Sequence, residues 1–277
     1  MTITLIEVPY DLGRGRVGLG AGPERLVDAN SDDVEVVSVE RPGAFRNEVS
    51  ASFDVIRALA ARVREVIARG SFPVVVAGNC SSALGTVAGL RRENLGVVWF
   101  DAHGDFHTPD TSASGFLDGM ALAMLTGSGW RAARATVDGL RPVPPGSVVL
   151  VGARDLDPEE SDRFARSDVA ITDRPALGSH LDRLRERVSD VYLHVDLDVL
   201  DPAEGRANSW AAAEGLSAQD AASAIDEVAR RFRIRAAALT AYDPRCDPED
   251  EVPAAAASIL ARVRRAVERQ ETEVAAG

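Results

Sequence analysis

Residues 96–105 read GVVWFDAHGD. The first half is an apolar run typical of a buried strand, and Asp101, His103 and Asp105 follow it at alternate positions. A strand that ends in this way predicts that carboxylate oxygens and an imidazole nitrogen lie together at the rim of a sheet, provided that the backbone stays extended. Such donors suit Mn²⁺, Mg²⁺ or Zn²⁺. We therefore expect a metal site at this point.

A second stretch, YLHVDLDVL at residues 192–200, repeats the pattern. Strand alternation would put Asp196, Asp198 and His194 on one face. Taken alone, each pair of acids could equally cap a loop. Two such pairs at the ends of separate strands favour a metal centre instead, and they indicate a hydrolase that uses two metal ions.

Short β-branched runs alternate with longer amphipathic segments along the whole chain. The expected strands cover residues 4–8, 34–39, 73–77, 96–100, 147–151, 169–172, 191–196 and 234–240. The expected helices cover residues 23–29, 52–69, 82–92, 117–127, 158–165, 177–188, 217–231 and 249–270. This alternation predicts an α/β fold with a mostly parallel sheet and helices on both sides. We expect one domain over residues 1–277, with a frayed tail after about residue 270.

Composition excludes several classes of partner. The 277 residues include 43 acidic and 31 basic side chains, for a net charge of −12, so we expect neither nucleic acid nor an anionic membrane as a partner. Two cysteines, Cys80 and Cys246, are too few for a disulfide framework in a chain of this size. Neither a signal peptide nor a membrane-spanning run is visible, and we expect a cytoplasmic location.

A glycine-rich run, GRGRVG at residues 13–18, fits the G-x-G-x-x-G pattern of dinucleotide-binding proteins. In that fingerprint the helix starts within the motif, so that its amides face the pyrophosphate. Here Gly20 and Gly22 follow, and the next helix is expected to start at Pro23, beyond the motif. This order favours a plain glycine-rich loop, with a nicotinamide-dependent enzyme as the weaker alternative.

Two motifs carry a family resemblance. DAHGD at 101–105 and DLDVLDP at 196–202 resemble the D-A-H-x-D and D-x-D-x-x-D-P signatures of the ureohydrolase (arginase/agmatinase) family, and GAGP at 20–23 is similar to its N-terminal turn. The resemblance implies a three-layer α/β/α fold and two Mn²⁺ ions bridged by a hydroxide, which attacks a guanidinium carbon. By position, the implied ligands are Asp101, His103, Asp105, Asp196 and Asp198.

The first departure from the family is Cys80. The family usually has G-G-D-H where this chain has AGNC at residues 77–80, so Cys80 stands in the place of the remaining metal-binding histidine. A thiolate ligand is soft and shifts the preference from Mn²⁺ toward Zn²⁺ or Fe²⁺. The alternative is that Cys80 is a small buried residue. We favour ligation, because the residue follows a strand that ends beside the other ligands.

The second departure is Asp118, which stands where arginases carry a mobile histidine. Either Asp118 carries the proton after burial raises its pKa, or the reaction needs no such acid. In motif detail, Cys80 and Asp118 together are closest to the N-hydroxyarginine hydrolase branch of cycloserine biosynthesis. That branch has the cysteine ligand and lacks the histidine.

The third departure is Ala241, which stands where arginases place a glutamate that binds the guanidinium group. Asp243, two residues further on, is our candidate to replace it. At the amino-acid end, the resemblance assigns Ser114 to the substrate carboxylate and Asp157 to its α-ammonium group, with Glu160 following at the matching place. His107 replaces a family asparagine there. Ordinary loop and helix-cap chemistry is the alternative for this set.

These observations predict a binuclear metal hydrolase that cleaves C–N bonds in a small guanidino or amidino amino-acid derivative, such as N-hydroxyarginine. Asp105 would orient the nucleophile and Asp118 would carry a proton. We expect two Mn²⁺ ions, with Zn²⁺ or Fe²⁺ as alternatives, and the sequence is compatible with a monomer or a homo-oligomer. The alternative function is a non-catalytic family member that binds metal or ligand without hydrolysis.

Overall fold

A parallel eight-stranded sheet forms the middle of the computed structural model, which describes residues 2–31 and 34–276. Its strands are β1 (Ile3–Val8), β4 (Glu35–Ser38), β5 (Phe72–Ala77), β6 (Leu95–Phe100), β7 (Val148–Val151), β8 (Ala170–Thr172), β9 (Asp190–Asp196) and β10 (Arg233–Thr240). They lie side by side in the order β4-β1-β5-β10-β9-β6-β7-β8. Every neighbouring pair is parallel.

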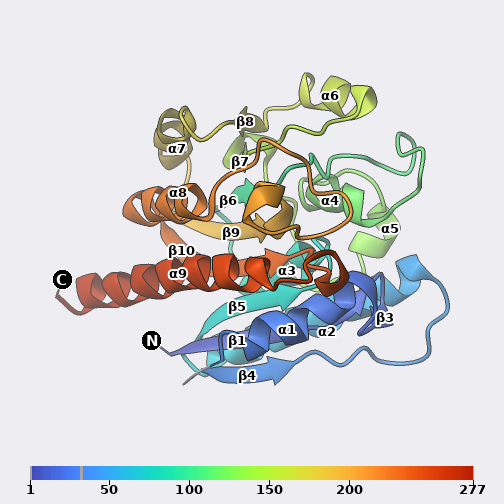
Figure 1. The fold of residues 1–277 in the computed structure, drawn as a ribbon, viewed down its shortest axis with the longest axis horizontal. Coiled ribbons are helices and arrows are strands. Elements are labelled where there is room, and N and C mark those ends of the chain that lie inside the picture. Colours follow the sequence, from blue (N-terminus) through green and yellow to red (C-terminus); the bar gives the residue numbers. More distant parts are fainter. Residues whose placement is uncertain (1, 32–33, 277) are drawn as a thin grey trace.

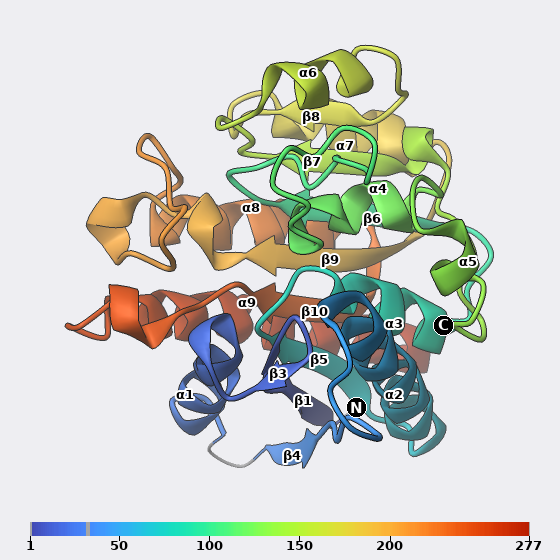
Figure 2. The same cartoon turned by 90° about the vertical axis from the view of Figure 1, so that its right-hand side faces the viewer.

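Helices cover both faces of this sheet (Figures 1 and 2). They are α1 (Gly22–Asp28), α2 (Glu48–Ala68), α3 (Ser82–Leu90), α4 (Ala121–Leu125), α5 (Arg131–Arg134), α6 (Pro158–Phe164), α7 (Leu177–Arg185), α8 (Ala218–Arg231) and α9 (Glu251–Ala276). Short 3₁₀ turns are η1 (Gly18–Ala21), η2 (Asp118–Met120), η3 (Pro145–Ser147), η4 (Leu197–Val199), η5 (Pro202–Glu204) and η6 (Pro244–Cys246). The expected three-layer α/β/α architecture is confirmed.

The central strands are apolar on both faces because helices bury both. Every residue of β5, β6 and β9 is buried. Successive side chains alternate between two cores: Val98 packs in the core that contains α1, α7, α8 and α9, and Trp99 packs in the core that contains α2, α3 and α4. Continuous apolar runs of this kind are typical of parallel strands.

The glycine-rich run at residues 13–18 lies in a hairpin of β2 (Tyr10–Asp11) and β3 (Arg14–Gly15) and runs into η1. Helix α1 starts at Gly22, beyond the motif, as the sequence predicted. A Cβ atom on Gly22 would lie 2.0 Å from the carbonyl oxygen of Tyr242, so the close contact between this turn and the η6 side of the fold requires glycine. This packing role supports the loop interpretation over a dinucleotide site.

Some local expectations were wrong. The hairpin and α5 were not expected, and the helix predicted over residues 117–127 is η2 followed by the short α4. Helix α2 begins four residues before its predicted start at Ser52, because the Asn47 side chain accepts a hydrogen bond from the Ser50 amide and caps it there. Helix α9 continues to Ala276, and fraying of the tail in solution stays a prediction.

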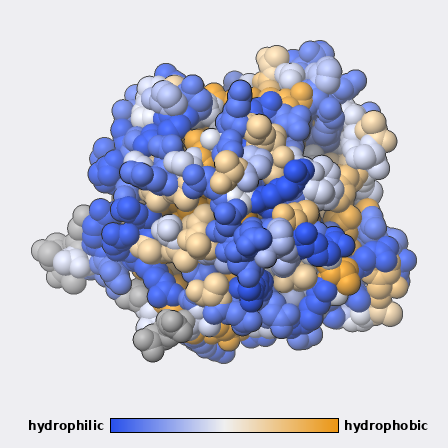
Figure 3. Space-filling model, in the orientation of Figure 1, coloured by the Kyte–Doolittle hydropathy of each residue, from blue (hydrophilic) through white to orange (hydrophobic). Residues whose placement is uncertain are grey.

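The molecular surface in Figure 3 is mostly hydrophilic, with apolar residues scattered among polar ones. Within the described residues, no helix combines the length and the apolar character needed to span a membrane.

Candidate metal centre

The candidate site lies at the carboxyl ends of β5, β10, β9 and β6, which are neighbours in the sheet. Cys80 follows β5, residues 101–105 follow β6, and Asp196 ends β9. Ala241 follows β10 directly. Because parallel strands end at one edge, segments that are far apart in the sequence meet here, as expected for ligand sites in open α/β sheets.

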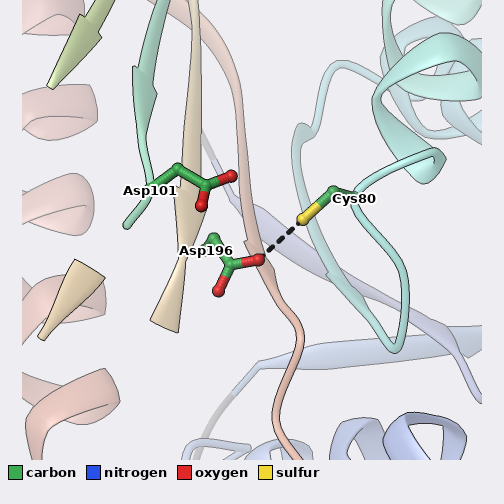
Figure 4. A group of neighbouring side chains, drawn as sticks. All are labelled: Cys80, Asp101 and Asp196. Atoms are coloured by element: carbon green, nitrogen blue, oxygen red, sulfur yellow. Dashed lines mark hydrogen bonds between the residues drawn. The ribbon is translucent and has the colours of Figure 1, made fainter. Parts of the chain in front are cut away.

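Two groups of potential metal ligands share one carboxylate. Cys80, Asp101 and Asp196 offer ligand atoms that lie within 4.8 Å of one another, and Asp101, His103 and Asp198 form a second such group. Figure 4 shows Cys80 pointing from the β5–α3 loop toward Asp196, with Asp101 on the neighbouring strand end. All but Asp101 of the six predicted ligands line a cavity of about 250 Å³.

The backbone does not place these ligands by simple strand alternation, so that premise was wrong. Strand β6 ends at Phe100, and Asp105 has a φ of +49°, outside the extended region. Strand β9 ends at Asp196, whose side chain accepts a hydrogen bond from the Asp198 amide at 2.8 Å and starts the 3₁₀ turn η4. Tight turns after the strands therefore bring the carboxylates together.

His194 does not join the ligands, although alternation placed it beside them. Its ring is fully buried and stacks on Trp99, with ring centroids 3.6 Å apart and an angle of 17° between the planes. Burial lowers the pKa of His194 to about 3, so the imidazole is neutral at neutral pH.

Asp101 and Asp198 are held in place by donors behind them. Asp101 accepts hydrogen bonds from the Trp99 indole at 2.8 Å and from the His103 amide at 2.7 Å. Asp198 accepts one from the Asn208 amide group at 3.0 Å. These bonds fix the orientation of the carboxylates before any ligand binds, as outer partners of metal ligands commonly do.

His103 lies between the same two carboxylates. Its Nδ1 atom is 3.2 Å from Asp198 and 3.4 Å from Asp101. Burial alone would lower the pKa of His103, but the hydrogen bonds and charges of Asp101 and Asp198 raise it to about 12. The carboxylates thus create a strong preference for positive charge at this point.

Asp105 and Asp196 show the same preference for a cation. Burial, together with the charges of nearby carboxylates, raises the pKa of each well above its ordinary value. The Oδ2 atom of Asp105 is buried and has no hydrogen-bond partner within the described part of the chain. An unpaired buried carboxylate oxygen is costly unless a cation or water satisfies it. The donor set of carboxylates, imidazole and thiol therefore fits a pair of divalent ions.

Cys80 is 2% exposed, and its Sγ atom donates a hydrogen bond to Asp196 Oδ2 at 2.9 Å. Burial, followed by the charges of Asp196, Asp105 and other carboxylates, raises the pKa of the thiol well above its ordinary value. The sulfur is therefore a protonated thiol here. Metal binding would replace that proton, since the thiolate is the form that binds metals.

Asp118 lines the cavity, but its carboxylate is fully engaged. It accepts hydrogen bonds from the Asn79 side chain at 2.9 Å, the Cys80 amide at 3.1 Å and the Ser81 amide at 2.9 Å. Both amides lie directly before α3, so Asp118 holds the loop that leads into this helix from another segment of the chain. Burial raises the pKa of Asp118 to about 6, although these bonds oppose the rise.

The predicted substrate-binding residues divide into two sets. His107, Ser114 and Asp157 line the cavity, and His107 Nε2 lies 3.1 Å from an Asp157 oxygen. Asp243 is absent from the lining, and its carboxylate binds the Arg245 side chain at 2.6 Å. The structure therefore brings Ala241, and not Asp243, to the cavity.

Glu160 also lines the cavity, and it supports the ligand loop. Its Oε1 accepts a hydrogen bond from the Phe106 amide at 2.7 Å. A Cβ atom on Gly104 would lie 2.6 Å from the Glu160 carboxyl, so glycine in D-A-H-G-D leaves room for this contact. This glutamate fixes the position of the loop that presents Asp105.

Several lining residues escaped the sequence analysis, among them Phe116, Asn208 and Trp210. The rings of Phe116 and Trp210 stack with centroids 5.3 Å apart, although they come from loops after different strands. Trp210 is 50% exposed. A tryptophan in an alanine-rich loop that follows a ligand strand was the signal that could have revealed this pair.

A model of the arginase family matches residues 1–264. The chain belongs to the arginase family. It is 32% identical to the arginase of Bacillus caldovelox over 93% of this chain and 96% of that protein, and 30% identical to the arginase of Bacillus subtilis over 94% and 96%. The crystal structure of the Bacillus cereus arginase superposes with a TM-score of 0.85 at 28% identity, covering 95% of this chain and 98% of that one.

Membership confirms the family that the two aspartate motifs indicated, and it supports the hydrolase class. The N-hydroxyarginine branch is a finer prediction that rests on Cys80 and Asp118.

Proposed function

We propose that this arginase-family hydrolase is a binuclear metal enzyme that cleaves a C–N bond of a small guanidino or amidino amino-acid derivative, of which N-hydroxyarginine is the best candidate. The observation that carries the proposal is Ala241, which lines the cavity with a methyl group and stands where, by the resemblance, arginases carry the glutamate that binds the guanidinium group.

Ala241 lies next to the metal ligands. The Asn208 side chain donates hydrogen bonds to Asp198 at 3.0 Å and to the Ala241 carbonyl oxygen at 2.9 Å, so one residue joins the two positions. A planar cation without a paired carboxylate loses its strongest recognition. An N-hydroxy substituent makes a guanidine less basic, so a neutral form is accessible at neutral pH. A neutral group needs no carboxylate, and the apolar wall at Ala241 then suits it.

The engaged state of Asp118 supports the same conclusion. A proton shuttle must leave its partners, and this carboxylate accepts three hydrogen bonds that hold the Cys80 loop. We therefore assign Asp118 mainly to positioning Cys80. It would carry a proton only after these hydrogen bonds open.

Two groups of side chains could each hold one ion. Cys80, Asp101 and Asp196 would hold the first, and Asp101, His103 and Asp198 the second, with Asp105 beside them. When bound, two divalent ions activate a water molecule as a nucleophile and polarise the carbon under attack. Asp105, through its unpaired Oδ2 atom, would accept a proton from the attacking water and orient it. Mn²⁺ suits the oxygen-rich set, and the cysteine sulfur favours Zn²⁺ or Fe²⁺.

The outer part of the cavity suits the amino-acid end of such a substrate. Asp157, whose side chain is 69% exposed, would bind the α-ammonium group, while His107 and Ser114 would donate hydrogen bonds to the carboxylate. The stacked Phe116 and Trp210 would pack against the aliphatic part between the two ends.

Turnover with each candidate substrate tests the proposal. The protein is loaded in turn with Mn²⁺, Zn²⁺ and Fe²⁺, and ornithine release is measured from L-arginine and from N-hydroxy-L-arginine. We expect kcat/KM for the hydroxylated substrate to exceed that for arginine by at least about tenfold, or about 1.4 kcal/mol. A kcat/KM for arginine equal to or above that for N-hydroxyarginine would contradict the proposed substrate. If neither compound is turned over with any of the metals, the proposal that the protein is an enzyme is contradicted.

A further inference from the structure

A continuous chain of buried polar side chains leads to the sulfur of Cys80 from inside the sheet. Tyr192 Oη lies 2.8 Å from His194 Nδ1, His194 Nε2 lies 3.2 Å from Thr240 Oγ1, and Thr240 Oγ1 lies 3.1 Å from Cys80 Sγ. The first three residues are fully buried. They sit on the adjacent strands β9 and β10, where Thr240 pairs directly with Asp196.

The donors and acceptors in this chain can be assigned a direction. A neutral imidazole has one donor nitrogen and one acceptor nitrogen. Because Cys80 directs its own proton at Asp196, the arrangement that gives every contact one donor has Thr240 donate to the sulfur, His194 Nε2 donate to Thr240 Oγ1, and the Tyr192 hydroxyl donate to Nδ1. The hydroxyl proton of Thr240 is then free to be donated to Cys80 Sγ, and its competing acceptor, the Val195 carbonyl oxygen, is further away at 3.4 Å. In this assignment, each hydrogen bond of the chain is donated toward the sulfur.

The stacking of His194 fixes the middle of the chain. The ring lies against Trp99, and Trp99 donates from its indole nitrogen to the ligand Asp101. The imidazole therefore cannot rotate away from Thr240 without disturbing the support of a second ligand. The ring holds the Thr240 hydroxyl in one orientation. In other metal sites, groups outside the ligand set orient the ligands by hydrogen bonds in the same way.

Cys80 faces two different partners. Its own proton is directed at Asp196, and Thr240 approaches the same sulfur as a donor. A sulfur bound to a cation would use one lone pair for the metal and keep others for hydrogen bonds. Hydrogen bonds to a ligand sulfur hold its direction and tune the electron density that it gives to the metal.

We propose that Thr240, held by the ring of His194, is a positioning residue for Cys80: its hydroxyl donates a hydrogen bond to the sulfur and fixes that sulfur as a metal ligand. The inference rests on the proposed function, because it takes Cys80 as a ligand. It adds that the cysteine works together with a hydroxyl and an imidazole from the two adjacent strands. Valine at position 240 would preserve the shape but remove the donor.

Cobalt spectroscopy of the whole protein tests this without relying on activity. Co²⁺ titrations of the wild type and of Thr240→Val, Thr240→Ser and Cys80→Ser follow the sulfur-to-cobalt charge-transfer band and the affinity. We expect the band in the wild type and in Thr240→Ser, and no band in Cys80→Ser. In Thr240→Val the band should shift and the affinity for Co²⁺ should fall by about 10–100-fold.

The outcomes separate the two claims. Suppose that the wild type shows the band and that Thr240→Val has the same band and the same affinity for Co²⁺. This result overturns the role of Thr240 and leaves the proposed function standing. Absence of a charge-transfer band in the wild type overturns Cys80 as a ligand, and with it the ligand set of the proposed function. If Thr240→Val does not fold, His194→Gln is read in the same way, with a shift in the same direction expected.

Discussion

Replacing Asp118 with alanine separates a structural role of this carboxylate from a catalytic one. Its two oxygens accept hydrogen bonds from three buried donors: the Asn79 side chain and the amides of Cys80 and Ser81. Alanine leaves all three without that acceptor at the start of α3. We therefore expect a loss of stability even when metal and substrate are absent.

The size of that loss follows from the three donors. An unpaired buried donor costs about 1–3 kcal/mol. Asp118 borders the cavity, so water can reach the vacated space, and the lower end of that range applies to each donor. The free energy of unfolding should fall by about 3 kcal/mol in Asp118→Ala, and by less in Asp118→Asn, which keeps one acceptor oxygen.

Urea unfolding of the chelator-treated protein measures this change. The matched control is Asp157→Ala, another cavity aspartate whose side chain is 69% exposed, for which we expect a change within about 0.5 kcal/mol. A change below about 1 kcal/mol in Asp118→Ala, with an unaltered urea dependence, would refute the structural role and favour proton transfer as the role of Asp118.

Two further predictions concern charge. Burial would raise the pKa of Asp190, but hydrogen bonds and charges from Arg235 and Arg233 outweigh this effect and lower the pKa. Asp190→Asn should therefore destabilise the protein at pH 7. The loss should become smaller as the pH falls below about 3.9, the ordinary pKa of an aspartate. Denaturation of both proteins at pH 7 and pH 3 checks this, and a constant margin would contradict it. Ala241→Glu should raise kcat/KM for arginine relative to N-hydroxyarginine, because the new carboxylate can pair with a guanidinium; an unchanged ratio would show that position 241 does not select the reactive end.

The sequence was a good guide to the sheet and to the ligands that end its strands. Apolar runs such as residues 96–100 mark strands that helices bury on both faces, and parallel strands must end at one edge. Cys80, Asp101 and Asp196 could therefore be expected to converge. Their detailed placement could not, because it depends on a left-handed residue at Asp105 and on a 3₁₀ turn.

The side-chain partners of these residues were outside the reach of sequence patterns. Asp243 was expected to replace the missing glutamate, but Arg245, two residues away, captures its carboxylate. Asp118 was expected to move a proton, and the donors that hold it come from a loop about 38 residues earlier in the chain. The Phe116–Trp210 stack joins two loops that share no motif. Each of these contacts depends on which side chains the folded structure brings together. The spacing of residues in the sequence does not specify that.

The most direct test of the central claim is a crystal structure of the metal-loaded protein. We predict two divalent ions at this edge of the sheet, one of them bound by the Cys80 sulfur at about 2.3 Å if it is zinc, and the other by His103, with Asp101 shared. Full occupancy of both positions with the sulfur beyond about 3 Å from either ion, well outside the length of a metal–thiolate bond, would contradict the account.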